Sequence, residues 1–256
     1  MARAKKERSE ITLEIDQPLA SKVEKTRSRA KNYVLDLRVY SPASNGYISL
    51  DGLDAAPAIV RLAKVKGLDV IAITDLFSAD FIDRMVSASK DSPLTVIPGV
   101  GLRCRVGNCD DIVMSCLFPE NTKAEHINRF LNAMDVPSQA ESRHRHLVTK
   151  PLREILETLD AFGGIAIPSR LDKTPNRKAE IRNLVENYGF RAFDLAYGDS
   201  AEYFKRSWPK LQFHLFSFSD ANALAQIGSR TARVKLNLPG FEGIREIVAR
   251  KEQPAS

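Results

Sequence analysis

The sequence has few cysteines and lacks long apolar runs, and these two shortages exclude several classes of protein. Three cysteines occur in 256 residues, Cys104, Cys109 and Cys116, and none of them forms a C-x-x-C pair. A small, odd number of cysteines is typical of a protein kept reduced, not of a disulfide-stapled secreted domain. No apolar run reaches 18 residues, so we predict no membrane-spanning helix and no membrane partner.

Targeting and nucleotide-binding motifs are also missing. The first residues are charged and lack the apolar core of a signal peptide, so we expect a cytoplasmic protein. Neither a G-x-x-x-x-G-K-[ST] loop nor a G-x-G-x-x-G turn before a helix occurs. The sequence therefore shows no sign of the two common glycine-rich loops that cradle phosphates.

The positive charge is concentrated near the beginning of the sequence. The net charge is +6, and residues 1–31 hold nine Lys or Arg against five Asp or Glu, which places +4 of the +6 there. We therefore divide the chain into a basic N-terminal arm, residues 1–32, and a folded domain, residues 33–256. The arm is either a solvated tail or a surface that attracts nucleic acid or another acidic partner.

Seven short apolar runs mark the expected strands of the domain. Each is four to eight residues long and rich in Val, Ile, Leu or Phe, which favours buried parallel strands over half-exposed antiparallel ones. The runs lie at residues 33–40, 68–74, 94–100, 111–118, 164–168, 191–197 and 212–218.

Helical patterns lie between most of these runs, for example at residues 54–66 and after Pro239. Strand–helix alternation predicts an α/β fold with a parallel sheet, and seven strands favour a barrel over an open sheet. The polar stretch 135–150 has no periodic pattern, so we expect a loop there. In a barrel or an open sheet, the functional face lies where the strands end.

Polar motifs follow several of the strands in a fixed order. They are Asp36-Leu-Arg-Val-Tyr-Ser41, Ser44-Asn-Gly46, Ile73-Thr-Asp-Leu76, Pro98-Gly-Val-Gly101, Ile167-Pro-Ser-Arg170 and Ser219-Asp-Ala-Asn222. Their order and spacing resemble the motifs of the PHP (polymerase and histidinol phosphatase) superfamily, from about residue 34 to residue 250. That family shows D-L-H-x-H-S, S-D-G, T-D-H, P-G-x-E, a late strand histidine and S-D-A-H. The resemblance implies a distorted seven-stranded (β/α) barrel and descent from metal-dependent phosphoesterases.

The sequence departs from the family at nearly every metal-binding position. Other residues stand in place of the family's ligands: Arg38, Tyr40, Asn45, Leu76, Gly101, Val113, Arg170 and Asn222. Asp36 and Asp75 survive beside the ligand positions, and of the aligned ligands only Asp220 remains. Arg has no lone pair to donate and stays protonated, and Leu, Val and Gly offer no side-chain ligand. We therefore expect no resident cofactor and at most one weak metal contact, at Asp220.

Arg38 and Arg170 are the main candidates for a new site at the barrel mouth. Two guanidiniums could bind a phosphate-like anion where the family holds metal ions. Tyr40, Asn45, Ser169 and Asn222 would assist as neutral hydrogen-bonding groups. The alternative is that three remaining carboxylates neutralise the two arginines and plug the site; these are Asp36, Asp75 and Asp220.

Two functions follow from the resemblance and its departures. The first is a catalytically inactive PHP-like protein that binds a phosphate-like anion, a protein partner or nucleic acid. The second is an active phosphoesterase for nucleotides, nucleic acid or a small phosphate ester. That activity would require Zn, Mn or Fe, or Arg and Asp acting without metal.

Overall fold

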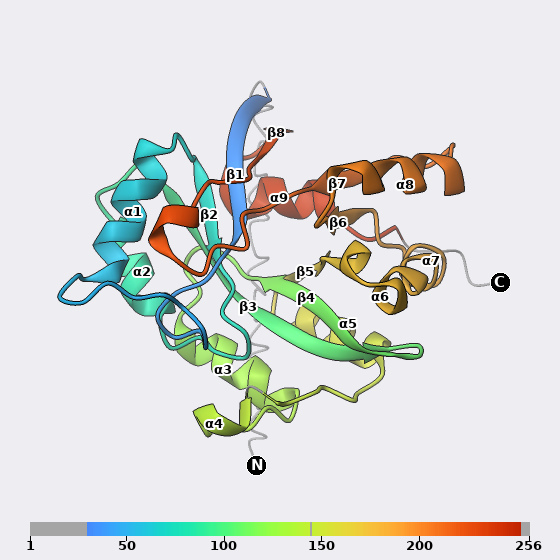
Figure 1. Ribbon diagram of the computed structural model, residues 1–256, viewed down its shortest axis with the longest axis horizontal. Helices are drawn as coiled ribbons and strands as arrows, with labels where there is room; N and C mark the ends of the chain where they lie inside the picture. Colours follow the sequence, from blue (N-terminus) through green and yellow to red (C-terminus); the bar gives the residue numbers. More distant parts are fainter. Residues whose placement is uncertain (1–29, 144, 252–256) are drawn as a thin grey trace, which may run out of the picture.

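The computed structural model describes residues 30–143 and 145–251, and it shows a mixed α/β fold around one curled sheet (Figure 1). The eight strands occur in the order β7-β6-β5-β4-β3-β2-β1-β8 and form a nearly closed barrel. Their bounds are β1 Lys31–Val39, β2 Val70–Ile73, β3 Thr95–Val106, β4 Cys109–Leu117, β5 Ile165–Ser169, β6 Ala192–Asp194, β7 His214–Phe216 and β8 Ala232–Leu236. The predicted fold class is therefore confirmed. Of the predicted arm, residues 1–32, only residues 30–32 belong to the described part of the chain.

Helices surround the sheet, with α1 and α2 on one side of the molecule and α6 to α8 on the other (Figure 1). Their bounds are α1 Ala55–Val65, α2 Ile82–Ser89, α3 Ala124–Ala133, α4 Ala140–Arg143, α5 Leu152–Ala161, α6 Pro175–Ala179, α7 Ile181–Glu186, α8 Ala201–Ser207 and α9 Gly240–Val248. Helix α1 shows why the sequence folds this way: Asp54 caps its first turn by accepting from the Ala56 N–H, and Ile59 and Ala63 are buried against the sheet. Within the described ranges, no helix is both long and apolar enough to cross a bilayer.

All seven predicted runs contain strands, but the direction expected for β4 was wrong. Strand β4 pairs antiparallel with both β3 and β5. Two residues, Gly107 and Asn108, separate β3 from β4. A connection this short makes a hairpin, because a parallel pair needs a crossover of a dozen or more residues. Gly107 has a φ of +54°, which glycine adopts at little cost.

Strand β8 is an addition that the apolar runs did not predict. It pairs antiparallel with β1, with Lys31 opposite Leu236 and Leu35 opposite Ala232. Its five residues alternate between partly buried and exposed positions until Leu236, which is buried. Alternation of this kind belongs to an edge strand with one face in water, so the segment lacks the continuous apolar run by which the other strands were found.

Helix α9 covers one end of the barrel. The N–H of Phe241 donates to Glu120 Oε1 at 2.7 Å, and Gly240 lies beside Thr95, the first residue of β3. Phe241, Ile244 and Val248 of α9 pack into a buried cluster with inward residues of the strands. A second cluster fills the space between the sheet and the outer helices. With the N-terminal end of the barrel closed by α9, the opposite end remains for the site.

The barrel closes at that opposite end through backbone contacts beyond the strands. The Tyr40 N–H donates to the Ala221 carbonyl at 2.9 Å, and the Ala221 N–H donates to the Arg38 carbonyl at 3.3 Å. These bonds tie the segment after β7 to the end of β1. Away from these two hydrogen bonds, β7 and β8 are the two edge strands of the sheet, and a seam remains between β7 and β8.

Candidate functional site

Four charged side chains from four segments meet at the barrel mouth. Arg38 lies on β1, Arg170 follows β5, Asp194 ends β6, and Asp220 follows β7. Arg38 Nε donates to Asp220 Oδ1 at 2.7 Å, although the two residues are 182 positions apart in the chain. We call these four residues the Arg–Asp cluster. It places Arg38, Arg170 and Asp220 together, as the motif order predicts.

Arg38 is the centre of the cluster. Besides Asp220, its Nη2 donates to the Tyr40 hydroxyl at 2.8 Å, and its Nη1 lies 4.0 Å from Asp194 Oδ2. Its side chain is 8% exposed. Burial alone would lower the pKa of Arg38, but the oxygens of Tyr40, Asp220 and Asp194 raise it above its usual value. Arg38 is therefore a permanent buried cation.

Arg170 lies behind Arg38 and is fixed mainly by backbone groups. Its N–H donates to the Asp194 carbonyl at 2.7 Å, and its Nη2 donates to the Phe218 carbonyl at 3.0 Å. Its guanidinium is 3.6 Å from both Asp194 Oδ2 and Asp220 Oδ2, and its buried Nε has no hydrogen-bond partner. Arg170 therefore neutralises carboxylates from behind the mouth.

Two members of the cluster have an unusual backbone. Arg170 has a φ of +56° and Asp220 a φ of +55°, in the left-handed region that residues with a Cβ rarely adopt. Each costs on the order of 1–2 kcal/mol relative to an ordinary conformation. Such conformations gather at functional sites, where the surrounding structure holds them in place.

Asp194 is the member that the motifs did not identify. Its Oδ1 accepts from the Phe218 N–H at 3.0 Å, and its Oδ2 faces Arg38 and Arg170 without a hydrogen bond to either. Burial raises the pKa of Asp194 to about 6, and the two arginines and the Phe218 N–H offset only part of that effect. The sequence did contain one indication of this role: an aspartate stands inside the apolar run at 191–197, and a buried carboxylate requires a partner.

The cluster does not suit the metal centre that the resemblance implies. Asp194 and Asp220, its two carboxylates, face guanidiniums, whose positive charge opposes a cation at the same place. Leu76, Gly101 and Val113 add no donor atoms. Across the part of the chain that the structure describes, no group of three or more His, Cys, Asp or Glu side chains is placed to hold a metal ion.

Asp36 and Asp75 have a structural role in this mouth. Asp36 accepts from the backbone N–H groups of Ser219 at 3.1 Å and Gly228 at 3.0 Å, which fixes the loop that carries Asp220. Asp75 accepts from the Ser41 N–H at 2.7 Å and from the Ser41 and Ser44 hydroxyls. Burial raises the pKa of both carboxyls. The alternative in which three carboxylates neutralise the arginines therefore holds for Asp220 and not for Asp36 and Asp75, because these contacts occupy the latter two; Asp194 stands beside Asp220 in their place.

A pocket of about 300 Å³ opens beside Arg38. Its lining consists of Arg38, Tyr40, Ser44, Asn45, Thr74, Leu76, Gly101, Val113, Ser115 and Asn222. Thr74 is 2% exposed and its Oγ1 has no hydrogen-bond partner among the described residues, so this hydroxyl is free to bond a polar group in the pocket. Burial raises the pKa of Tyr40 to about 12, which keeps its hydroxyl protonated as a donor.

Two of the predicted site residues lie behind this pocket and do not line it. Arg170 contacts the carboxylates of the cluster, as described above. Ser169 shares a hydrogen bond of 3.0 Å with Ser115, whose side chain does reach the pocket. Of the predicted ligand-binding residues, Arg38, Tyr40, Asn45 and Asn222 line it directly.

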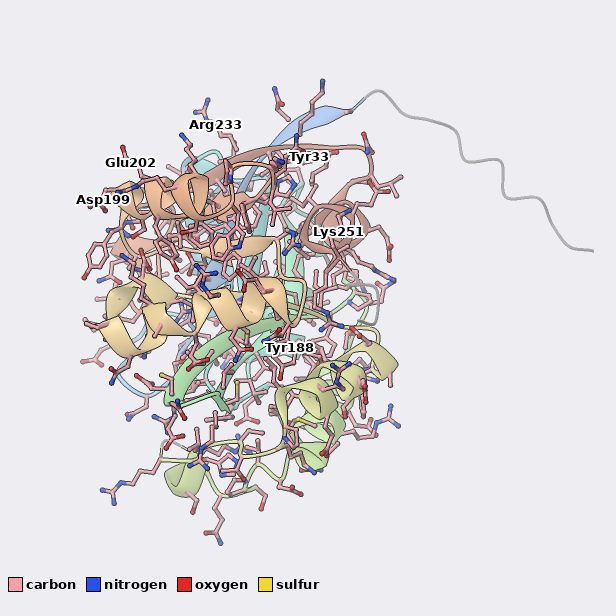
Figure 2. All side chains as sticks on the ribbon, turned by 90° about the vertical axis from the view of Figure 1, so that its right-hand side faces the viewer. Tyr33, Tyr188, Asp199, Glu202, Arg233 and Lys251 are labelled. Atoms are coloured by element: carbon pink, nitrogen blue, oxygen red, sulfur yellow. The ribbon has the colours of Figure 1, made fainter. Side chains whose placement is uncertain are left out.

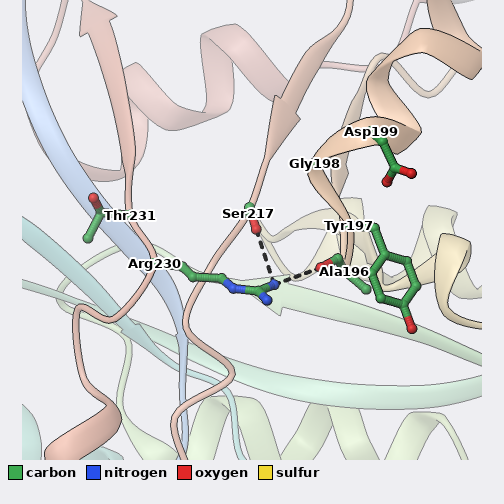
Figure 3. A pocket seen from close by; sticks show the side chains of 7 residues that line it. All are labelled: Ala196, Tyr197, Gly198, Asp199, Ser217, Arg230 and Thr231. Carbon is green, nitrogen blue, oxygen red and sulfur yellow. Dashed lines mark hydrogen bonds between the residues drawn. The ribbon is translucent and has the colours of Figure 1, made fainter.

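Two larger cavities, of about 560 and 490 Å³, lie along the seam between β7 and β8. In the first, Arg230 Nη1 donates to the Ala196 carbonyl at 2.7 Å and lies 3.5 Å from Ser217 Oγ, so it closes part of the seam (Figure 3). Figure 2 shows Asp199 and Arg233 on this side of the molecule. None of the predicted site residues lines these cavities, so we place the candidate site at the Arg–Asp cluster.

Comparisons with known proteins identify the fold through structure and not through sequence. No model of a known family matches the chain, and no curated protein matches it. Endonuclease Q, in complex with a 27-mer duplex carrying an abasic lesion, has a TM-score of 0.59 and 15% identity. The alignment covers 84% of this chain and 56% of the Endonuclease Q chain, so this chain spans little more than half of that protein.

Two further solved structures match over nearly their whole length. An amidohydrolase from Chromobacterium violaceum, with bound sulfate and no metal, has a TM-score of 0.59 and 13% identity, covering 84% of this chain and 97% of that one. A putative metal-dependent phosphoesterase from Bifidobacterium adolescentis has a TM-score of 0.56 and 13% identity, covering 86% and 96%. At this identity the likeness shows the fold alone: a distorted α/β barrel, consistent with the PHP-like architecture that the motifs predict.

Proposed function

We propose that this chain is a non-catalytic PHP-like protein that binds a small phosphate-like anion in the pocket beside Arg38. The observation that carries the proposal is the Arg–Asp cluster itself. A buried guanidinium, held by Asp220 at 2.7 Å, lines a pocket at the end of the barrel where the resemblance places the metals. A fixed cation of this kind can bind phosphate oxygens without activating a water molecule.

The hydrogen bonds around Arg38 leave donors for a ligand. Its Nε is used by Asp220 and one N–H of Nη2 by Tyr40, whereas a guanidinium has five N–H groups. Thr74 adds an unpartnered hydroxyl, and the side chains of Asn45 and Asn222 stand at the same pocket. The pocket therefore offers several neutral donors around one cation.

The charge balance sets the kind of binding expected. Two arginines face two aspartates, so the Arg–Asp cluster is neutral when both carboxyls are ionised. Attraction at long range is then small, and affinity depends on directed hydrogen bonds inside the pocket. We therefore propose a small anion held by geometry, without a strongly positive groove.

Nucleic acid is a second candidate for the source of the phosphate. The Endonuclease Q structure contains duplex DNA, and residues 1–31 of this chain carry a net charge of +4. Contacts between lysine or arginine and a phosphate backbone weaken steeply as salt rises. Duplex and single-stranded DNA binding, measured at two salt concentrations with and without residues 1–29, separates this source from a free phosphate ester.

We expect phosphate to stabilise the folded protein through Arg38. At ten times its dissociation constant, a ligand that binds only the folded state adds about 1.4 kcal/mol, or roughly 3–6 °C in melting temperature for a chain of this size. The paired variant Arg38→Gln with Asp220→Asn should abolish this rise, because it removes the cation and its partner together and leaves no orphaned charge. Thermal unfolding in a phosphate titration at constant ionic strength measures both.

The control for this titration is a second Arg–Asp pair of similar geometry. Arg84 and Asp54 are joined at 2.9 Å, but both side chains are about 60% exposed and lie away from the pocket. Phosphate also stabilises proteins by general exclusion from their surface, and this control pair should keep that effect. The proposal fails if the wild-type rise is absent, or if Arg38→Gln with Asp220→Asn retains as much of it as Arg84→Gln with Asp54→Asn.

A further inference from the structure

The seam between β7 and β8 exposes the backbone of two edge strands. In β7, the His214 N–H donates to the Arg191 carbonyl at 2.8 Å. The Phe216 carbonyl accepts from the Leu195 N–H at 2.9 Å. Both groups face β6, and neighbouring residues of a strand direct their backbone groups to opposite sides. The N–H and carbonyl of Leu215 therefore point into the seam, where the described strands offer no partner.

Strand β8 turns its own free edge to the same seam. The Val34 carbonyl of β1 accepts from the Asp69 N–H at 2.9 Å, so the backbone of Val34 faces β2 and not β8. Arg233 lies opposite Val34 in the antiparallel ladder, where bonded and non-bonded pairs alternate. The backbone groups of Arg233 and Lys235 therefore face the seam. One cavity of about 490 Å³ is lined by both strands.

The side chains along the seam form an inward apolar row and an outward basic one. Phe216, Ala232 and Val234 pack with the cluster inside the barrel, and Ala232 and Val234 are only half-buried. Arg233 lies between these two and is exposed on the other face of β8 (Figure 2). Asp199 is the one carboxylate among the residues that line the two seam cavities. The seam therefore suits a strand that alternates apolar and acidic residues.

We propose that residues 10–16 of this chain bind in the seam as an added strand. Their sequence, EITLEID, alternates apolar with polar residues and contains three acids and no base. Ile and Thr also favour extended backbone. In this arrangement the apolar residues extend the inward row and the acids lie on the face of Arg233. The apolar residues are Ile11, Leu13 and Ile15, and the acids are Glu10, Glu14 and Asp16.

The connection to the rest of the chain permits this placement. Strand β1 begins at Lys31, opposite Leu236 of β8, so the chain enters the fold beside the strand that borders the seam. Residues 17–30 lie between, and when extended they span up to roughly 45 Å, several times the spacing of neighbouring strands. Pro18 has no N–H to donate, so it limits the added strand to the residues before it.

Tethering favours this occupant over a strand from another molecule, because the segment binds its own seam intramolecularly. The assignment concerns a surface away from Arg38 and does not rest on the proposed function. It gives the arm a role that its net charge does not indicate, since an acidic stretch lies within a basic segment.

A nitroxide spin label in the full chain tests where the segment lies. Ser9→Cys places a reactive thiol directly before it, whereas the three native cysteines are buried. We expect the label to broaden the amide NMR signals of Leu215 and Arg233. The signals of helix α3, which lies far from the seam in Figure 1, should stay sharp. Sharp signals at Leu215 and Arg233 would overturn the proposal.

A mixture of two chains distinguishes the chain's own segment from that of a second copy. Spin-labelled chain without isotope enrichment is mixed with unlabelled, isotope-enriched chain, so that broadening can arise only between molecules. We expect none at Leu215 or Arg233. Broadening in the mixture means that a second copy supplies the strand, and the intramolecular assignment is then wrong.

Two adjacent substitutions test which face of the segment is inward. Leu13→Asp turns a charge toward the barrel interior, whereas Thr12→Asp places the same side chain on the outward face. We expect Leu13→Asp to speed hydrogen exchange at Leu215 and Arg233 at least about tenfold, because an edge amide loses protection when its partner strand detaches. Thr12→Asp should change these rates less than about twofold, and exchange at Ile71 on central strand β2 should stay unchanged in both. Wild-type rates in Leu13→Asp, or equal acceleration by both substitutions, contradict the proposal.

Discussion

Replacing Arg38 with glutamine is expected to lower the free energy of unfolding by about 3–5 kcal/mol, because breaking a buried ion pair from one side leaves an uncompensated charge. Arg38 is 8% exposed at its side chain and lies between Asp220, at 2.7 Å, and Asp194, at 4.0 Å. Without its guanidinium, Asp220 loses its 2.7 Å partner, and both Asp194 and Asp220 keep only their contacts of 3.6 Å with Arg170. Urea unfolding at pH 7 measures the loss.

Two variants show whether that loss comes from the cluster. Arg84→Gln breaks a bridge of 2.9 Å between side chains that are about 60% exposed, and should cost less than about 1 kcal/mol. Asp220→Asn combined with Arg38→Gln should cost less than the sum of the two single changes, because the pair is then removed together. If Arg38→Gln costs no more than Arg84→Gln, the guanidinium is not the buried centre described above.

The stability conferred by Asp194 is expected to depend on pH in the opposite sense to that of most ion-paired aspartates. Its pKa of about 6 lies above the ordinary value of 3.8, so the folded state binds the proton more tightly than the unfolded chain. The contribution is fully present below about pH 4 and is lost as the pH rises through about 6. The difference between these two pKa values corresponds to roughly 3 kcal/mol of stability.

Asp194→Asn removes this titration while an amide oxygen can still accept from the Phe218 N–H. The stability of the wild type relative to the variant should therefore fall by up to about 3 kcal/mol between pH 4 and pH 8. Asp199→Asn, on the exposed turn before α8, is the matched control and should show no such trend. Parallel pH profiles for the wild type and Asp194→Asn would show that Asp194 is ionised throughout, held by the arginines.

The sequence was sufficient to predict most of the barrel. The seven apolar runs gave strands because buried strands need continuous apolar residues, and α9 begins directly after Pro239 as the pattern indicated. Strand β8 and the direction of β4 were not predicted. Exposed Arg233 and Lys235 interrupt the apolar signal of β8, and the direction of β4 depends on a two-residue hairpin at Gly107, which an apolar run does not encode.

The sequence predicted which arginines meet at the candidate site, but not all of the carboxylates that pair with them. The motif order brought Arg38 and Asp220 to one mouth, because strands of one barrel end at the same face. Asp194 was missed because it lies inside a strand-like run, where nothing in the local pattern shows what it faces. Asp36 and Asp75 were offered, in the alternative interpretation, as partners of the arginines, because charge alone does not reveal that a carboxylate is occupied by backbone N–H groups.

The central claim is that the Arg–Asp cluster fills the barrel mouth where the resemblance of the sequence motifs implies a metal centre. Elemental analysis of the purified chain, after incubation with Zn²⁺, Mn²⁺ and Fe²⁺ and removal of loosely bound ions, tests it most directly. We predict less than one tightly bound equivalent per chain, because two arginines face the two carboxylates of the mouth. Two or more equivalents, lost together in an Asp194→Ala, Asp220→Ala double variant, would contradict the account.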